Sequence, residues 1–130
     1  MGQALNIAKN FYDATNLHGR EIDALLPQIG GFLADDFKFS GPLMTSRGSA
    51  EYLKILKQFL QFHAEYRFIK QFEEGNDVCS IYELIVNTPG GNRLTIPMAD
   101  YLKISDGKIQ EQVIYYDPRG FAEAFGMAQL

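Results

Sequence analysis

Asp100 is the residue whose surroundings most favour acid–base chemistry. It stands in a run whose alternate residues are otherwise apolar, namely Leu94, Ile96, Met98, Leu102 and Ile104. Successive side chains of a strand point to opposite faces, so this register places one carboxyl within an apolar stripe. Burial disfavours the charged carboxylate, which predicts a raised pKa for Asp100 unless a donor or cation compensates. A protonated acid there could donate a hydrogen bond to a developing oxyanion.

Pro97 leaves a second interpretation of Asp100 open. A proline inside a strand favours a bulge or bend, and a bulge would reverse the register of the residues that follow. Asp100 would then be solvated, or paired with a lysine or arginine of a neighbouring strand.

Asp117 and His63 are further titratable groups at the ends of predicted elements. Asp117 precedes Pro118 at the start of a predicted helix, where it is expected to cap the helix. His63 follows a predicted helix, so it either interacts with the free carbonyls there or acts as a base at a pocket rim.

Composition and motifs argue against several classes of function. The formal net charge is −4 and the 12 Lys and Arg residues are scattered, which argues against a nucleic-acid surface. No apolar run approaches the roughly 20 residues of a membrane span, and no signal peptide is visible, so we expect a cytoplasmic protein. The two histidines and Cys79 lack metal-ligand spacing, and no glycine-rich phosphate loop opens a helix. We therefore expect neither a metal nor a cofactor.

The first half of the chain is predicted to be mainly helical. Apolar spacing indicates helices over residues 3–17, 21–33 and 48–63, and Pro27 is expected to kink or divide the second. A short strand is predicted at residues 36–40.

After residue 63 the apolar period changes from 3.6 to 2. Strands are predicted over residues 66–73, 78–87, 93–105 and 109–116, followed by a helix over 118–127. Short turns between the strands favour an antiparallel meander, and helices gathered at one end of the chain favour an α+β fold with helices on one face.

Four short segments carry a family resemblance through their order and spacing. Residues 34–37 lead into the first strand, 47–48 open the third helix, 100–110 form a strand and turn, and 115–117 precede the last helix. Over about residues 4–126 the chain resembles the SnoaL-like and ketosteroid-isomerase-like branch of the nuclear transport factor 2 superfamily. The resemblance implies one SnoaL-like domain over residues 1–130. It also implies a cone-shaped α+β barrel of cystatin-like topology, with a curved antiparallel or mixed sheet wrapped around the N-terminal helices.

The resemblance also implies roles for two aspartates. Asp100 matches an oxyanion-binding acid of ketosteroid isomerases, and Asp117 is similar to an acid–base aspartate of SnoaL-like polyketide cyclases. The isomerases carry a base where this chain has Ser40, and a tyrosine where it has Phe11, with Tyr12 one residue on. Steroid isomerisation is therefore not expected.

We expect an apolar pocket for a small molecule, although the same side chains could fill a closed core. Its predicted residues are Phe11, Tyr12, Phe39, Met44, Phe59, His63, Met98, Gln112, Ile114 and Tyr116. The pocket would serve a cyclase, isomerase or hydrolase that uses Asp100 or Asp117 without a cofactor, or a binding module without turnover. The resemblance implies a homodimer through the outer sheet face. It is supported by the sheet aromatics, half of which should face outward, namely Tyr66, Phe68, Tyr82, Tyr101, Tyr115 and Tyr116. An interaction module for another chain is the remaining alternative.

Overall fold

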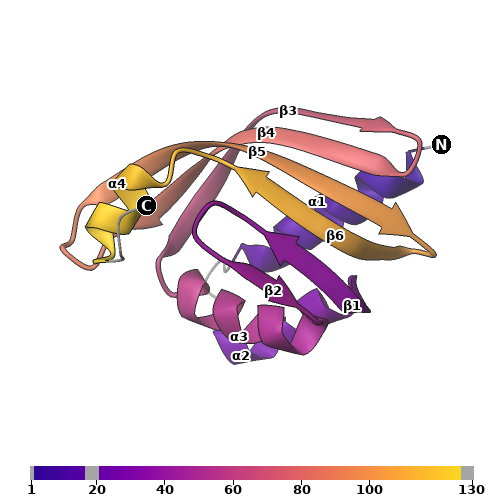
Figure 1. The fold of residues 1–130 in the computed structure, drawn as a ribbon, viewed down its shortest axis with the longest axis horizontal. Coiled ribbons are helices and arrows are strands. Elements are labelled where there is room, and N and C mark those ends of the chain that lie inside the picture. The colour runs from indigo at the N-terminus through magenta and orange to yellow at the C-terminus, as the bar shows by residue number, and fades with distance from the viewer. Residues whose placement is uncertain (1, 17–20, 127–130) are drawn as a thin grey trace.

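A computed structural model describes residues 2–16 and 21–126 of the chain (Figure 1). The helices are α1 (Gln3–Thr15), α2 (Ile22–Gly30), α3 (Ser49–Leu60) and α4 (Arg119–Ala124). The strands are β1 (Leu33–Ser40), β2 (Thr45–Arg47), β3 (His63–Glu74), β4 (Asp77–Asn87), β5 (Arg93–Ser105) and β6 (Lys108–Tyr115).

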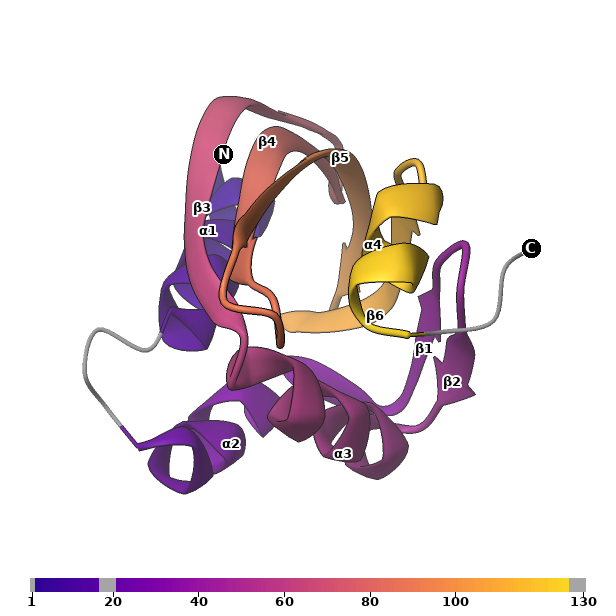
Figure 2. The same ribbon diagram turned by 90° about the vertical axis from the view of Figure 1, so that its left-hand side faces the viewer.

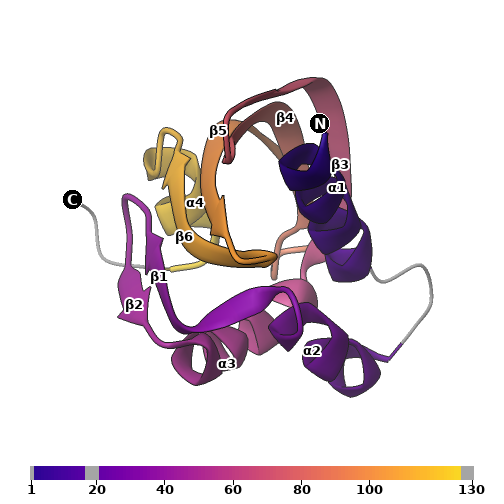
Figure 3. The same ribbon diagram turned by 90° about the vertical axis from the view of Figure 1, so that its right-hand side faces the viewer.

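The strands form one six-stranded sheet in the order β2-β1-β6-β5-β4-β3. β1 runs parallel to β6, while the other neighbouring pairs are antiparallel. Figures 2 and 3 show that the sheet curls strongly without closing, with α1, α2 and α3 along its open side. The predicted α+β fold, with a curved mixed sheet around N-terminal helices, is confirmed.

The hydrophobic core lies on the concave face of the sheet. From Ile96 to Ile104 of β5 every second side chain is buried, as the alternation in the sequence predicts, and β4 buries every second side chain from Val78 to Val86 together with Ile85. α1 turns its buried residues toward β3 and β4 and brings two aromatic rings, Phe11 and Tyr12, into the core. Each fully buried large apolar side chain stabilises the fold by about 1.5–3 kcal/mol, so this concave layer holds the helices on the sheet.

Neither Pro27 nor Pro97 interrupts its element, so the predicted division of the second helix and the predicted bulge of the strand are wrong. α2 continues through Pro27 as one helix and ends at Gly30, which sacrifices only the hydrogen bond to the carbonyl of Asp23. β5 passes Pro97 without a bulge, and its register with β4 is unbroken. Pro97 precedes the part of β5 that pairs with β6, which starts at Ala99, so its missing N–H group costs no bond to β6.

The C-terminal helix is shorter than predicted. α4 begins at Arg119, with Pro118 rather than Asp117 in the N-cap position, and ends at Ala124. Residue 127, the predicted end of this helix, lies outside the described residues. Figure 2 shows α4 beside the strongly curved part of β5 and β6.

Candidate functional site

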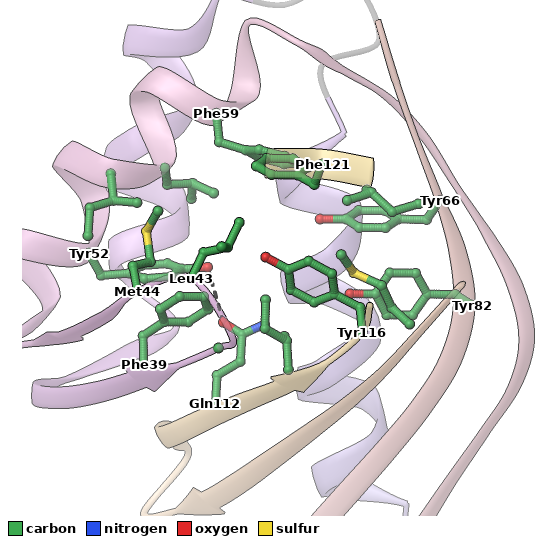
Figure 4. A pocket seen from close by; sticks show the side chains of 16 residues that line it. Phe39, Leu43, Met44, Tyr52, Phe59, Tyr66, Tyr82, Gln112, Tyr116 and Phe121 are labelled. Carbon is green, nitrogen blue, oxygen red and sulfur yellow. Dashed lines mark hydrogen bonds between the residues drawn. The ribbon is translucent and has the colours of Figure 1, made fainter. Parts of the chain in front are cut away.

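A cavity of about 120 Å³ lies between α3, α4 and the concave face of the sheet (Figure 4). Most of its wall is aliphatic or aromatic, and its polar side chains are four tyrosines and one glutamine. No Asp, Glu, His, Lys or Arg is among the described residues that line it. The lining residues are Phe39, Gly41, Leu43, Met44, Tyr52, Ile55, Leu56, Phe59, Tyr66, Tyr82, Leu84, Met98, Gln112, Ile114, Tyr116 and Phe121.

The turn after β1 forms one rim of the cavity. The N–H of Gly41 donates to the carbonyl of Met44 at 3.0 Å, which folds Leu43 and Met44 over the opening. A Cβ at position 41 would lie 2.8 Å from Cγ1 of Ile114. Glycine is thus required for β1 to end this close to β6.

A chain of hydrogen bonds runs along the polar part of the wall. The Tyr52 hydroxyl donates to Oε1 of Gln112 at 3.1 Å, and Nε2 of Gln112 donates to Oδ2 of Asp100 at 2.9 Å. The Tyr82 hydroxyl donates to the same Oδ2 at 3.1 Å. The Gln112 amide is oriented with Nε2 toward Asp100, because a carboxylate accepts hydrogen bonds and cannot pair with the amide oxygen. The two residues that hold Asp100 therefore both line the cavity.

Asp100 itself lies behind the cavity wall. Its exposed fraction is 0%, and it is covered by Tyr82 and Gln112 rather than lining the cavity. Burial raises the pKa of Asp100 from 3.8 to about 6, while hydrogen bonds from Tyr12, Gln112 and Tyr82 oppose the rise. Within the described residues, neither the Tyr12 hydroxyl nor Oδ1 of Asp100 makes a hydrogen bond of standard distance and angle.

The expected inward direction of Asp100 is borne out by this burial. Its neighbour across the β4 pairing is Ser80, which is also fully buried. The alternative in which Asp100 is solvated is excluded, because β5 has no bulge at Pro97.

The tyrosines of the wall are neutral phenols. Burial raises the pKa values of Tyr52, Tyr66 and Tyr82 well above the ordinary value. Tyr66 is hydrogen-bonded to Oγ1 of Thr15 at 2.6 Å. Thr15 already donates its own proton to the carbonyl of Tyr12, so Tyr66 must be the donor. The wall can therefore orient a ligand or polarise it through hydrogen bonds, but none of its side chains can act as a general base near neutral pH.

Asp117 lies outside the cavity. Its side chain is 60% exposed and accepts the N–H of Arg119 at 3.1 Å and the guanidinium at 3.1 and 2.7 Å. These hydrogen bonds lower the pKa of Asp117 to about 2. The structure thus gives Asp117 a local role at the start of α4, close to the predicted helix cap.

His63 is buried beside the cavity rather than in its wall. Its Nε2 lies 2.7 Å from Oδ1 of Asn16, and its ring packs on Tyr66 with centroids 4.5 Å apart. His63 is the first residue of β3, three positions after the last residue of α3, and it is not among the residues that line the cavity.

The other predicted binding residues divide between wall and core. Phe11 and Tyr12 lie in the core, deeper than the wall. The predicted residues that do line the cavity are Phe39, Met44, Phe59, Met98, Gln112, Ile114 and Tyr116. The sequence analysis missed several wall residues that periodicity could have found, since they share the inward register or the apolar helix face, namely Tyr52, Ile55, Leu56, Tyr82 and Leu84. Phe121 of α4 had no such signal.

Residues 2–16 and 21–126 contain no helix that is both long and apolar enough to span a membrane. In the same residues, no three His, Cys, Asp or Glu side chains gather where they could hold a metal ion.

Several solved structures share this fold with the chain. An NTF2-like protein of unknown function from Cytophaga hutchinsonii is 30% identical, with a TM-score of 0.74 over 91% of this chain and 93% of that chain. An NTF2-like protein of unknown function from Burkholderia pseudomallei has a TM-score of 0.80 at 17% identity, over 96% and 98%. A Shewanella denitrificans protein whose name proposes a SnoaL-like polyketide cyclase has a TM-score of 0.76 at 16% identity, over 93% and 95%. No curated protein matches the sequence.

The family comparison agrees with the resemblance found in the sequence. The SnoaL-like domain model matches residues 8–112, a range that contains Asp100, Gln112 and most of the cavity wall. Asp117 and α4 lie beyond the matched range. The chain therefore belongs to the SnoaL-like domain family and has the NTF2-like fold.

Proposed function

We propose that this chain binds a small, mainly apolar molecule in the cavity beneath α3 and α4. The observation that carries the proposal is a wall that is apolar except for neutral tyrosine and glutamine groups. Such a wall combines favourable burial of apolar surface with a few groups that fix orientation, as in small-molecule sites generally.

The size of the cavity limits the ligand. A protein cavity of about 150 Å³ lined by Leu, Ile and Phe can hold benzene. The present cavity, at about 120 Å³, suits a molecule of about one six-membered ring, with substituents reaching past Met44 toward solvent. A steroid-sized ligand would require α4 or the rim turn to move.

Acid–base catalysis without a cofactor is a second candidate function. It is favoured by Asp100, because burial raises the pKa of this carboxyl to about 6 and hydrogen bonds from Gln112 and Tyr82 join it to the wall. Neighbouring structures named as possible cyclases or isomerases lend the same support. Asp100 would have to reach the ligand by displacing one of these two side chains, and for this reason we place binding first.

We also propose that a second copy of the chain covers the outer face of the sheet. Four large apolar side chains of β3, β4 and β6 are exposed, namely Ile69, Phe72, Ile81 and Tyr115. The Arg67–Glu83 and Lys103–Glu111 pairs add both signs of charge to these strands, so two copies related by a twofold axis can match. Light scattering should give a dimer for the wild type and a monomer for Ile81→Glu. A monomeric wild type would contradict this part of the proposal.

Binding is tested by titrating the protein with toluene and following the ligand by saturation-transfer NMR. We expect saturable binding in the wild type and at least a 10-fold loss in Met44→Trp, because the indole would fill the rim of the cavity. Tyr115→Trp adds bulk on the outer face and should leave binding unchanged. Equal effects of the two variants, or no binding by the wild type, would contradict the proposed site.

The catalytic alternative has its own readout. Acid–base chemistry on a bound ketone would accelerate exchange of deuterium into the methyl group of acetophenone in D₂O. Exchange above the rate without protein, abolished in Asp100→Asn, would make catalysis the better account. We expect no acceleration if the protein only binds.

A further inference from the structure

We infer that Tyr116 is the specificity-determining donor of the cavity, and that it selects apolar molecules carrying one hydrogen-bond acceptor, such as a ketone. This inference rests on the proposed binding function and deepens it by naming a ligand class. It comes from accounting for the protons of every polar side chain in the wall.

The other wall hydroxyls already donate within the protein. Tyr52 donates to Gln112 and Tyr82 to Asp100. Tyr66 donates to Thr15, because the proton of Thr15 is used on the carbonyl of Tyr12. A hydroxyl has a single proton to donate, so none of these three can donate to a ligand without breaking a hydrogen bond inside the protein.

Gln112 is committed as well. Its amide is held between the Tyr52 hydroxyl and Oδ2 of Asp100, and its exposed fraction is only 5%. These two bonds fix the direction of its second N–H, so the amide cannot turn to follow a ligand acceptor without leaving buried groups unpaired.

Tyr116 differs from all of these groups. Its hydroxyl makes no hydrogen bond within residues 2–16 and 21–126 and points into the middle of the cavity (Figure 4). Its ring is partly buried and packs edge-on against Phe121, with centroids 6.3 Å apart. A ligand acceptor at the cavity centre therefore meets the Tyr116 hydroxyl, whose proton is not donated to another group of the described residues.

Acetophenone and α-methylstyrene form a matched pair of probes. They have nearly the same shape and size, but a C=O group in the first is replaced by C=CH₂ in the second. A neutral hydrogen bond corresponds to a change in affinity of about 3- to 10-fold. We expect Tyr116→Phe to weaken acetophenone by about this factor and to leave α-methylstyrene unchanged.

Tyr66→Phe is the matched control. It removes a hydroxyl from the same wall, but one whose proton is already used. It should change the affinities for both probes by the same factor, so that the ratio of the two affinities stays at its wild-type value. Both affinities are measured by ligand-observed NMR, with circular dichroism to check that each variant folds.

The outcomes separate this inference from the proposed function. If α-methylstyrene binds but Tyr116→Phe weakens both probes equally, or neither, the cavity binds ligands and the assignment of Tyr116 is overturned. If neither probe binds the wild type, the proposed function fails and the inference fails with it. A selective loss for acetophenone in Tyr66→Phe would transfer the role to Tyr66 and would also overturn the inference.

Discussion

Asp100 and Asp117 are 17 positions apart in the sequence, yet their surroundings have opposite effects on the same carboxyl group. Asp100 is fully buried, and its pKa rises to about 6; Asp117 is mostly exposed beside Arg119, and its pKa falls to about 2. Only the first is joined to the cavity wall. The comparison indicates that the interior network, and not the exposed pair near α4, sets the properties of the site.

Breaking the interior network should give the largest effect on stability. Gln112→Leu removes a donor from Asp100 and the acceptor of Tyr52. We expect the free energy of unfolding to fall by about 2–4 kcal/mol at pH 8. The loss should be smaller at pH 5, where the carboxyl of Asp100 is protonated in the folded chain. Urea unfolding followed by circular dichroism measures both values.

Gln110→Leu is the control for that variant. Gln110 lies on the same strand, but its amide donates to the carbonyl of Ser105 on the exposed surface. The same change there should cost less than about 1 kcal/mol, because water can replace the lost partner. Equal losses of unfolding free energy in the two variants would mean that the interior network stabilises the fold no more than an exposed hydrogen bond does.

Asp100→Asn should change the pH dependence of stability. Between about pH 4 and pH 6 the folded wild type binds a proton that the unfolded chain has released, because the pKa of Asp100 is raised from 3.8 to about 6. Stability of the wild type therefore falls as pH rises through this window, by about 2–3 kcal/mol in total. Below pH 4 both states are protonated and this contribution is fully present.

The asparagine variant has no proton to release at this position. Its amide oxygen can still accept from Tyr82 and Gln112, so we expect the variant to fold. In urea titrations from pH 4 to pH 8, the free energy of unfolding of the variant should not show the fall with rising pH that Asp100 causes in the wild type. A wild type and variant with parallel pH profiles would argue against a raised pKa for Asp100.

Asp117→Asn should have the smallest effect. The side chain is exposed, so its ion pair with Arg119 is screened by water, and an asparagine oxygen can still accept the N–H of Arg119. We expect the Tm to change by less than about 2 °C and toluene binding to stay the same. A large loss of binding would return Asp117 to the candidate site.

Periodicity in the sequence predicted the direction of side chains but not their depth. The alternation around Asp100 correctly placed it on the inner face. Alternation cannot tell whether a residue lies in the cavity wall or one layer behind it, and this depends on Gln112 and Tyr82 from neighbouring strands. The pairing of Asp117 with Arg119 was not predicted, because a helix cap and an acid–base role both leave its side-chain partner two residues later unspecified.

The wall of the cavity was only partly predictable for a similar reason. Met98 and Ile114 follow from strand register, whereas Leu43 and Phe121 come from a turn and a short helix that have no periodic pattern. The unbroken course of β5 past Pro97 also depends on where β6 begins to pair, which is a tertiary property.

Where a bound ring lies in the molecule tests the central claim most directly. Intermolecular NOEs can be measured between toluene and the methyl groups of deuterated, methyl-labelled protein. We expect NOEs to Ile55, Leu56 and Ile114 of the cavity wall, and none to Ile81 on the outer face. NOEs to Ile81 without any to the wall would contradict a ligand site beneath α3 and α4.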